Sequence, residues 1–277
     1  MDVSFEDVTE SIVLAQNDYG ANLVCVALED ELVFVDAGLH AGFTAEFRSA
    51  MEERFGLKAS TLMVTHAHID HLLGVGAFSD CEVVAAEAGR MRFERFLAAE
   101  YTEEMIQGAE RLFPHFRESI ELAELSMPTT WVRNRMVLGE GDVVFQLVGG
   151  HSSCSSSIHV IPERVIMAGD LMQVDRTPYF GEPDTDVDKW IGALKTWEGM
   201  DLDAVVPGHG GAADRNYVTR VRVFFEEMLE ALRSLKEEVV PLDEVAHHPR
   251  LPSGYWPIDA ERKPTYDFSI NSLYKRL

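Results

Sequence analysis

Residues 61–71 read TLMVTHAHIDH, an apolar run followed by four potential metal ligands within six positions. The run 61–65 is β-prone, which predicts a buried strand that ends where the ligands begin. Neutral imidazole and ionised carboxylate are strong ligands for divalent metals. A hydrogen-bonded core histidine or a solvated loop is the simpler explanation, but neither accounts for four such residues beside the apolar LLG at 72–74. We therefore interpret the stretch as a metal site with room for two ions.

The chain before this stretch has the pattern of consecutive antiparallel strands. Short β-prone runs alternate with acidic or glycine-containing turns, as in a meander. The expected strands cover 11–15, 22–28 and 31–35. A helix is expected at 43–56, because apolar residues recur every four positions from Phe43 to Phe55.

The segment 87–125 has a different character from its surroundings. It follows an expected strand at 81–86 and is rich in Ala, Glu, Arg, Met and Phe at helical spacing, with a break at Pro114. We predict a helical insertion here. Two roles stay open for it: packing on the outside of the fold, or a lid over an apolar pocket. The side chains that would line such a pocket are Phe93, Phe96, Met105, Phe113 and Phe116.

The remaining chain repeats the order of strands followed by a helix. Strands are expected at 131–138, 143–148, 157–160, 165–168 and 203–206, and helices at 186–199 and 214–238. Because both halves have this order, we predict an α/β fold, an αββα sandwich of two mixed β-sheets with helices on the outer faces. We expect one domain at 1–240 and a loop-rich extension at 241–277. The extension is expected to pack on the domain or on a partner, which leaves a homodimer open.

Three further polar residues stand where an apolar strand gives way to glycine. They are His151 after Gly150, Asp170 after Gly169 and His209 after Gly208. Taken in order with the cluster at 66–71, this pattern resembles the metallo-β-lactamase superfamily over residues 11–211. Two less specific features match as well. Asp36-Ala37-Gly38 follows an early strand, and residues 205–210 read VVPGHG.

The resemblance implies a set of metal ligands. His66, His68 and His151 would hold a first ion, and Asp70, His71 and His209 a second. Asp170 would bridge the two ions, since a carboxylate has two oxygens. Asp36 is expected to orient the ligand loop. Zinc is the expected metal, because a three-histidine face with an open position is typical of catalytic zinc. Iron or manganese stays possible, because Asp70 and Asp170 make the second site rich in oxygen.

The resemblance also implies a hydrolase of the glyoxalase II or lactonase-like branch. A hydroxide held between the two metal ions would attack an ester-like bond, a thioester or a lactone, and Asp70 would help to hold or shuttle the proton. Tyr179 and Arg176 are expected in the substrate pocket. Two alternatives stay open: a phosphodiesterase of the same superfamily, and a non-catalytic metal-binding or sensor protein.

Three departures from the family pattern narrow the expectation. Cys154 stands where the family usually has glycine, and we expect it to be a packed thiol. Asp170 occupies the bridging position that is a cysteine in many antibiotic-cleaving members, which argues against a dedicated β-lactamase. His68 is not the glutamate of the diiron flavoprotein branch, which disfavours redox chemistry.

Composition excludes some partners. The chain has a formal net charge of -23, which repels nucleic acid and anionic lipid, so we expect a small-molecule substrate. Its three cysteines are too few and too scattered for a disulfide framework. Residues 1–7 are acidic and lack the apolar core of a signal peptide, and no apolar run reaches the length of a membrane span. A cytoplasmic location is therefore predicted.

Overall fold

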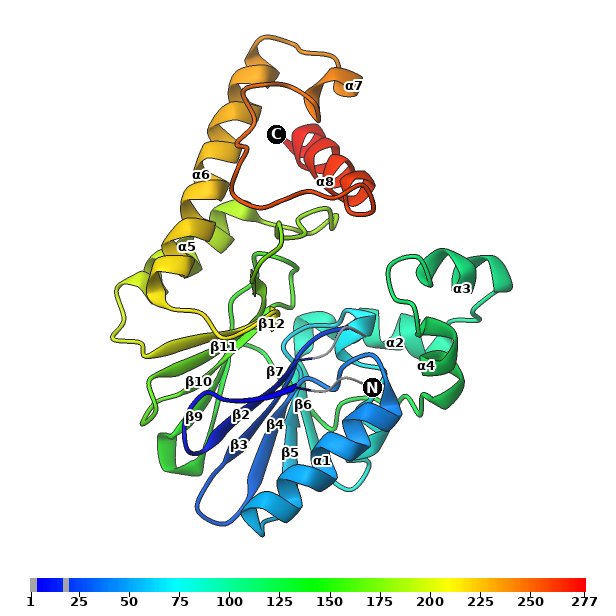
Figure 1. The fold of residues 1–277 in the computed structure, drawn as a ribbon, viewed down its shortest axis with the longest axis vertical. Helices are drawn as coiled ribbons and strands as arrows, with labels where there is room; N and C mark the ends of the chain where they lie inside the picture. Colours follow the sequence, from blue (N-terminus) through cyan, green and yellow to red (C-terminus); the bar gives the residue numbers. More distant parts are fainter. Residues whose placement is uncertain (1–3, 17–19) are drawn as a thin grey trace.

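Two mixed β-sheets form the centre of the computed structural model, which describes residues 4–16 and 20–277 (Figure 1). The first sheet consists, in spatial order, of β1 (Ser4–Asp7), β2 (Ile12–Gln16), β3 (Leu23–Ala27), β4 (Leu32–Val35), β5 (Ala59–Met63), β6 (Glu82–Ala86) and β7 (Thr130–Val132). The second has the order β12 (Ala204–His209), β11 (Val165–Gln173), β10 (Ser156–Val160), β9 (Val143–Leu147) and β8 (Arg135–Leu138). Pairing is antiparallel from β1 to β4 and from β8 to β11, and parallel elsewhere.

Successive side chains of β11 alternate between two hydrophobic cores, which shows how the layers pack. Val165 and Met167 belong to the core shared with the first sheet, whereas Ile166 and Ala168 belong to a second core. This second core contains the apolar faces of α5 (Val187–Glu198) and α6 (Arg215–Glu237). Helix α1 (Ala41–Phe55) covers the first sheet, where Phe47 meets Phe34 edge to face. Successive strand residues point to opposite faces of a sheet, so the observed layers are helix, sheet, sheet, helix. The predicted αββα fold is confirmed.

Capping side chains determine where the long helices begin. His40, Asp186 and Asp214 accept hydrogen bonds from the backbone N–H three residues further on, at the starts of α1, α5 and α6. Helix α1 ends at Gly56, whose φ of 67° suits a residue without a side chain.

The structure corrects two expected strands. The run 131–138 is not one strand, because β7 pairs with β6 in the first sheet and β8 pairs with β9 in the second. The chain crosses between the sheets at residues 133–134. The sequence could not predict this crossing, because a β-prone run does not show which strand it will pair with. Strand β11 also does not end at residue 168, but continues through Asp170 to Gln173.

The insertion and the C-terminal segment contain further helices. Residues 87–125 include α2 (Arg90–Ala98), α3 (Glu103–Ala109) and α4 (Phe116–Leu122), and Phe116 packs with Leu39 and Leu73. The segment from Pro241 was expected to be loop-rich, but it contains α7 (Leu242–Val245) and α8 (Lys263–Arg276), drawn beside α6 in Figure 1. Pro264 lies in the first turn of α8, where its missing N–H costs no helical hydrogen bond. The division into a domain and an extension stays a prediction.

Across the described residues, no helix combines the length and apolar character needed to cross a lipid bilayer.

Candidate metal centre

The ligand loop between β5 and η1 (Ile69–His71) is held in place by Asp36. The Thr65 backbone N–H donates to Asp36 Oδ1 at 2.7 Å, and the Thr65 hydroxyl donates to Oδ2 at 2.8 Å. The same Oδ2 lies 2.8 Å from His71 Nδ1. Asp36 adopts a φ of 59°, a conformation that aspartate and asparagine tolerate better than most residues. One buried carboxylate therefore fixes both ends of the loop.

The first group of ligand atoms comes from three imidazoles and one carboxylate. His68 Nδ1 lies 3.0 Å from His66 Nε2 and 3.1 Å from His151 Nε2. Asp170 Oδ2 completes the group, at 4.0 Å from His66 Nε2 and 3.7 Å from His151 Nε2. All four atoms lie within 4.8 Å of one another. This is the first set that the sequence predicted, with the shared Asp170 included.

The second group consists of Asp70, His71 and His209, whose ligand atoms also lie within 4.8 Å of one another. His209 Nε2 lies 3.2 Å from Asp70 Oδ2, and His71 Nε2 lies 3.9 Å from the same oxygen. Asp170 Oδ1 reaches this group too, at 3.3 Å from His71 Nε2 and 3.4 Å from His209 Nε2. The two oxygens of Asp170 thus face different groups.

Two glycines allow Asp170 to reach this position. A side chain on Gly208 would place its Cβ 2.1 Å from Asp170 Oδ1. Gly169 has a φ of 51°, and a Cβ there would lie 2.6 Å from the Thr65 hydroxyl oxygen. At Gly169 the backbone of β11 therefore approaches the ligand loop, and at Gly208 the backbone of β12 approaches Asp170, more closely than a side chain would permit.

Unsatisfied atoms show that the residues suit divalent cations. His71 Nε2 and Asp170 Oδ1 are buried and have no hydrogen-bond partner among the described residues. Buried polar atoms are normally paired, so two orphaned atoms that face each other at 3.3 Å call for a third species between them. Imidazole nitrogens and carboxylate oxygens are the donors that zinc, iron and manganese accept.

Burial and neighbouring charges favour the ligand forms of His66, His151 and Asp70. Burial lowers the pKa of His66 well below its usual value and the pKa of His151 to about 4, with adjacent imidazoles adding to the effect. Both rings are therefore neutral at neutral pH, as metal binding requires. Burial opposes ionisation of Asp70, but His71 and His209 outweigh it and lower the pKa of that carboxyl to about 2. Burial likewise opposes a charge on His71, yet Asp36, Asp70 and Asp170 raise its pKa well above the usual value. This negative field would equally attract a metal cation.

The nitrogens that face away from the two groups also have oxygen neighbours. His66 Nδ1 lies 3.0 Å from the Thr65 hydroxyl, and His209 Nδ1 lies 3.1 Å from the Gly20 carbonyl. His151 Nδ1 lies 2.9 Å from the Tyr179 carbonyl. An oxygen at the outer nitrogen fixes the ring orientation and leaves the inner nitrogen free to bind a metal.

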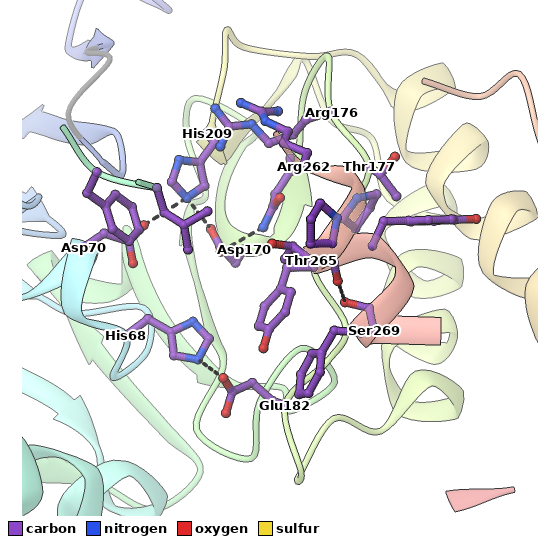
Figure 2. Close-up of a pocket in the computed structure, with 18 of the residues that line it drawn as sticks. His68, Asp70, Asp170, Arg176, Thr177, Glu182, His209, Arg262, Thr265 and Ser269 are labelled. Carbon is purple, nitrogen blue, oxygen red and sulfur yellow. Dashed lines mark hydrogen bonds and ion pairs between the residues drawn. The ribbon is translucent and has the colours of Figure 1, made fainter. Parts of the chain in front are cut away.

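Glu182 ends the segment 176–182 that was expected to line the site, but the sequence assigned it no role of its own. Its Oε1 lies 3.4 Å from His68 Nε2 (Figure 2). Its Oε2 accepts a hydrogen bond from Arg92 Nη2 at 2.9 Å. Arg92 also donates to Asp184 Oδ1 at 2.6 Å, and Asp184 Oδ2 accepts from the Ser153 N–H at 3.0 Å. His68 and then Arg92 lower the pKa of Glu182 to about 2. No motif marks this glutamate; its only signal is a position shortly after Arg176 and Tyr179.

A cavity of about 670 Å³ opens onto both groups. Its wall contains Asp70, Asp170, His68, His209 and the predicted pocket residue Arg176 (Figure 2). The other predicted pocket residue, Tyr179, also lines the cavity. Burial raises the pKa of the Tyr179 hydroxyl to about 12, so this hydroxyl keeps its proton at neutral pH. Cys154 is buried beside the ligand loop, where its Sγ lies 3.5 Å from the Ala67 N–H.

Comparisons with known proteins agree with this geometry. The model of the metallo-beta-lactamase superfamily matches residues 17–209. The structure of DIM-1 metallo-beta-lactamase superposes with a TM-score of 0.64 at 17% identity, covering 82% of this chain and 98% of that chain. A metallo-beta-lactamase from Pontibacter korlensis superposes with a TM-score of 0.61 at 15% identity, covering 81% of this chain and 99% of its own. One from Erythrobacter litoralis has a TM-score of 0.61 at 14% identity, covering 82% and 97% respectively. At such identities the likeness shows the fold alone. No curated protein matches the sequence.

Proposed function

The chain belongs to the metallo-β-lactamase superfamily, and from this premise we propose that it is a hydrolase with a dinuclear metal centre that cleaves an ester-like bond, a thioester or a lactone. The family match and the two His/Asp groups support a metal-dependent hydrolase. The observation that carries the proposal is the position of Asp170, whose Oδ2 faces one group and whose Oδ1 faces the other. A carboxylate shared in this way suits two cations that lie side by side.

The ligands divide as the geometry groups them. His66, His68 and His151 would hold one ion, and Asp70, His71 and His209 the other, with Asp170 shared. When bound, two such ions supply an activated water at neutral pH and polarise the carbonyl oxygen of the substrate. We propose zinc, with iron or manganese as alternatives.

The chain's own groups complete the proposed chemistry. Asp70 lies in the pocket wall, where its carboxylate can hold or shuttle the proton that the attacking water releases. Tyr179 lies in the same wall with its proton retained, and its hydroxyl can donate to the oxyanion that forms on the carbonyl. The acidity of the chain, with a net charge of -23, favours this substrate class over nucleic-acid phosphodiesters.

The test combines metal analysis with a small substrate panel. Zinc-loaded wild-type protein is assayed on a thioester, a lactone, a phosphodiester and a β-lactam. We expect about two ions per chain and turnover of the thioester or the lactone. H68A and D170A should lower the rate by more than about 100-fold, because loss of a ligand exceeds the effect of losing an outer partner. H247A, which removes an exposed histidine away from the pocket, is the matched control.

Three outcomes would contradict the proposal. Preference for the phosphodiester or the β-lactam would overturn the substrate class. Absence of hydrolysis of all four substrates at full metal occupancy would favour a metal-binding protein without turnover. Unchanged metal content and rate in D170A would overturn the shared-carboxylate centre itself.

A further inference from the structure

The strand that carries Asp170 brings a second polar side chain to the metal centre, that of Gln173. Strand β11 pairs with β12 in an irregular register, in which Gly169 lies opposite Pro207 and Gln173 lies opposite His209. In a regular strand, residues three positions apart point to opposite faces of the sheet. The irregularity instead turns Gln173 to the side of Asp170, as strand bulges beside functional sites often do.

The side-chain amide of Gln173 binds the shared carboxylate directly. Its Nε2 donates to Asp170 Oδ2 at 2.8 Å, and the two residues are only 4% and 6% exposed. An ionised carboxylate can only accept hydrogen bonds, so the amide must turn its N–H toward Asp170. Because a hydrogen bond to a charged group is about twice as strong as one between neutral groups, this contact restricts rotation of the carboxylate.

The contact makes the two oxygens of Asp170 unequal. Oδ2, which faces the first group of ligands, accepts the hydrogen bond from Gln173. A carboxylate oxygen has two lone pairs, so Oδ2 can accept this bond and still bind an ion. Oδ1, which faces the second group, is buried and has no hydrogen-bond partner among the described residues. With Oδ2 held by the amide, Oδ1 stays directed at the second group.

Helix α6 and the C-terminal segment support the backbone of Gln173. Its carbonyl oxygen lies 3.4 Å from the Tyr217 hydroxyl, in the first turn of α6. The same hydroxyl accepts hydrogen bonds from the Asp175 backbone N–H at 2.9 Å and from Trp256 Nε1 at 2.6 Å. The end of β11 is therefore bound to two other parts of the chain, which fixes the point from which the amide reaches Asp170.

We propose that Gln173 is a positioning residue for the metal centre, whose amide orients Asp170 so that each carboxylate oxygen faces one ion. This inference rests on the proposed dinuclear centre. A single ion keeps its other ligands if the carboxylate rotates, but two ions require both oxygens to point correctly at once. Gln173 therefore acts mainly on the binding of the second equivalent of metal.

Replacement of Gln173 by methionine tests the amide. Q173M keeps nearly the length and shape of the side chain and removes the donor. Titration of metal-free protein with zinc, in competition with a chromogenic chelator, gives a Kd for each equivalent. We expect Q173M to raise the Kd of the second equivalent by about 10- to 100-fold, the usual effect of losing an outer partner of a ligand, and the Kd of the first by less.

The chain offers a matched control for this substitution. Gln107 makes the same type of bond, from its amide to Glu103 Oε1 at 2.7 Å, on the exposed helix α3. Gln107 does not border the cavity, so Q107M should bind both equivalents of zinc as wild-type does. Q173N is the second test variant, because it keeps an amide that is one methylene too short to reach Asp170. It should show the same weaker second equivalent as Q173M.

Cobalt(II) in place of zinc gives a spectroscopic readout. Its visible absorption depends on the number and arrangement of its ligands, which a general loss of stability would not change selectively. In wild-type and Q107M, the absorption should change until about two equivalents are bound per chain. In Q173M, at the same protein concentration, the change should be largely complete after the first equivalent.

The outcomes separate this inference from the proposed function. Unchanged Kd values in Q173M and Q173N, with loss of metal in D170A, would overturn the role of Gln173 and leave the dinuclear centre intact. Equal weakening in Q107M would also overturn that role, because the effect would not be specific to Asp170. Binding of two ions that depends on Gln173, without hydrolysis of any substrate, would support the inference and overturn the hydrolase.

Discussion

Among the five histidines of the two groups, His68 is the one that turns Nδ1 inward. The other four present Nε2 to the groups and Nδ1 to an oxygen of the surrounding fold. For His68 this leaves Nε2 on the pocket side, 3.4 Å from Glu182. Glu182 is itself fixed by Arg92 from the insertion. Because the orientation of a ligand ring depends on its outer partner, the position of His68 depends on this pair.

Removing Glu182 should therefore weaken metal binding. We expect E182A to raise the Kd for zinc by about 10- to 100-fold, the usual effect of losing an outer partner of a ligand, and E182Q to recover part of the loss. Competition with a chromogenic chelator measures the Kd without any enzyme assay. E87Q, at an exposed glutamate that pairs with Arg133, is the control. An unchanged Kd in E182A would show that Glu182 does not position His68.

At the level of elements, β10 contains a histidine away from the metal centre. The strand lies between β9 and β11 in the second sheet, and His159 is its one residue that is not fully buried. His159 Nε2 lies 2.8 Å from the Ser157 hydroxyl. Burial, with a smaller contribution from Arg135, lowers the pKa of His159 to about 4 from an ordinary value of 6.5. The folded chain therefore keeps this ring neutral over a pH range where the unfolded chain protonates it.

This difference makes the stability of the fold depend on pH. In the unfolded state the His159 ring binds a proton below about pH 6.5, but in the folded state it does so only below about pH 4. The free energy of unfolding therefore falls as the pH falls from about 6.5 to about 4. The loss should be on the order of 2 kcal/mol. Denaturant unfolding of metal-free wild-type and H159Q proteins at pH 7.5 and 4.5 measures it, and H159Q should lose less stability. H247Q, at an exposed histidine, should behave as wild-type. Parallel losses in H159Q and wild-type would contradict the assignment.

On the scale of the whole molecule, α8 joins the second core to the metal centre. Ile270, Leu273 and Tyr274 are buried in the core that also contains α5 and α6. From the same helix, the Ser272 hydroxyl donates to the Gly181 carbonyl at 3.0 Å, and Arg276 donates to the Glu182 carbonyl at 2.6 Å. The C-terminal segment thus supports the backbone of the glutamate that contacts His68.

Substitutions on the two faces of α8 should affect different properties: the buried face the free energy of unfolding, and the pocket face the hydrolysis of substrate. L273A removes a buried side chain and should lower the free energy of unfolding by about 2–4 kcal/mol, because it leaves a cavity in the core. F268A removes an exposed side chain at the pocket and should change the free energy of unfolding by less than about 0.5 kcal/mol. F268A should instead lower kcat/KM on the thioester or lactone that the protein hydrolyses, because Phe268 borders the cavity. Denaturant unfolding and the hydrolysis assay measure the two effects. A large loss of stability in F268A would contradict this division of the helix.

Much of the architecture was predictable because it follows from local periodicity. Apolar residues every four positions from Phe43 predicted α1, and short β-prone runs predicted β2 to β4. The failures have a common cause. The run 131–138 was divided between two sheets, and α8 was hidden by Pro264 and its neighbours. In both cases the deciding interaction was with a distant element, which no local pattern contains.

The sequence by itself marked the seven candidate ligands, because four imidazoles and carboxylates stand within six positions and the other three follow in the order that resembles the metallo-β-lactamase superfamily. Only the tertiary structure decided what surrounds them. Arg92 and Glu182 are 90 positions apart and meet at His68 because the insertion and the segment after β11 pack on the same side of the ligand loop. Arg262 reaches the cavity only because α8 is anchored in the second core. Such contacts depend on how the whole chain packs its apolar surface, and sequence spacing carries no measure of that.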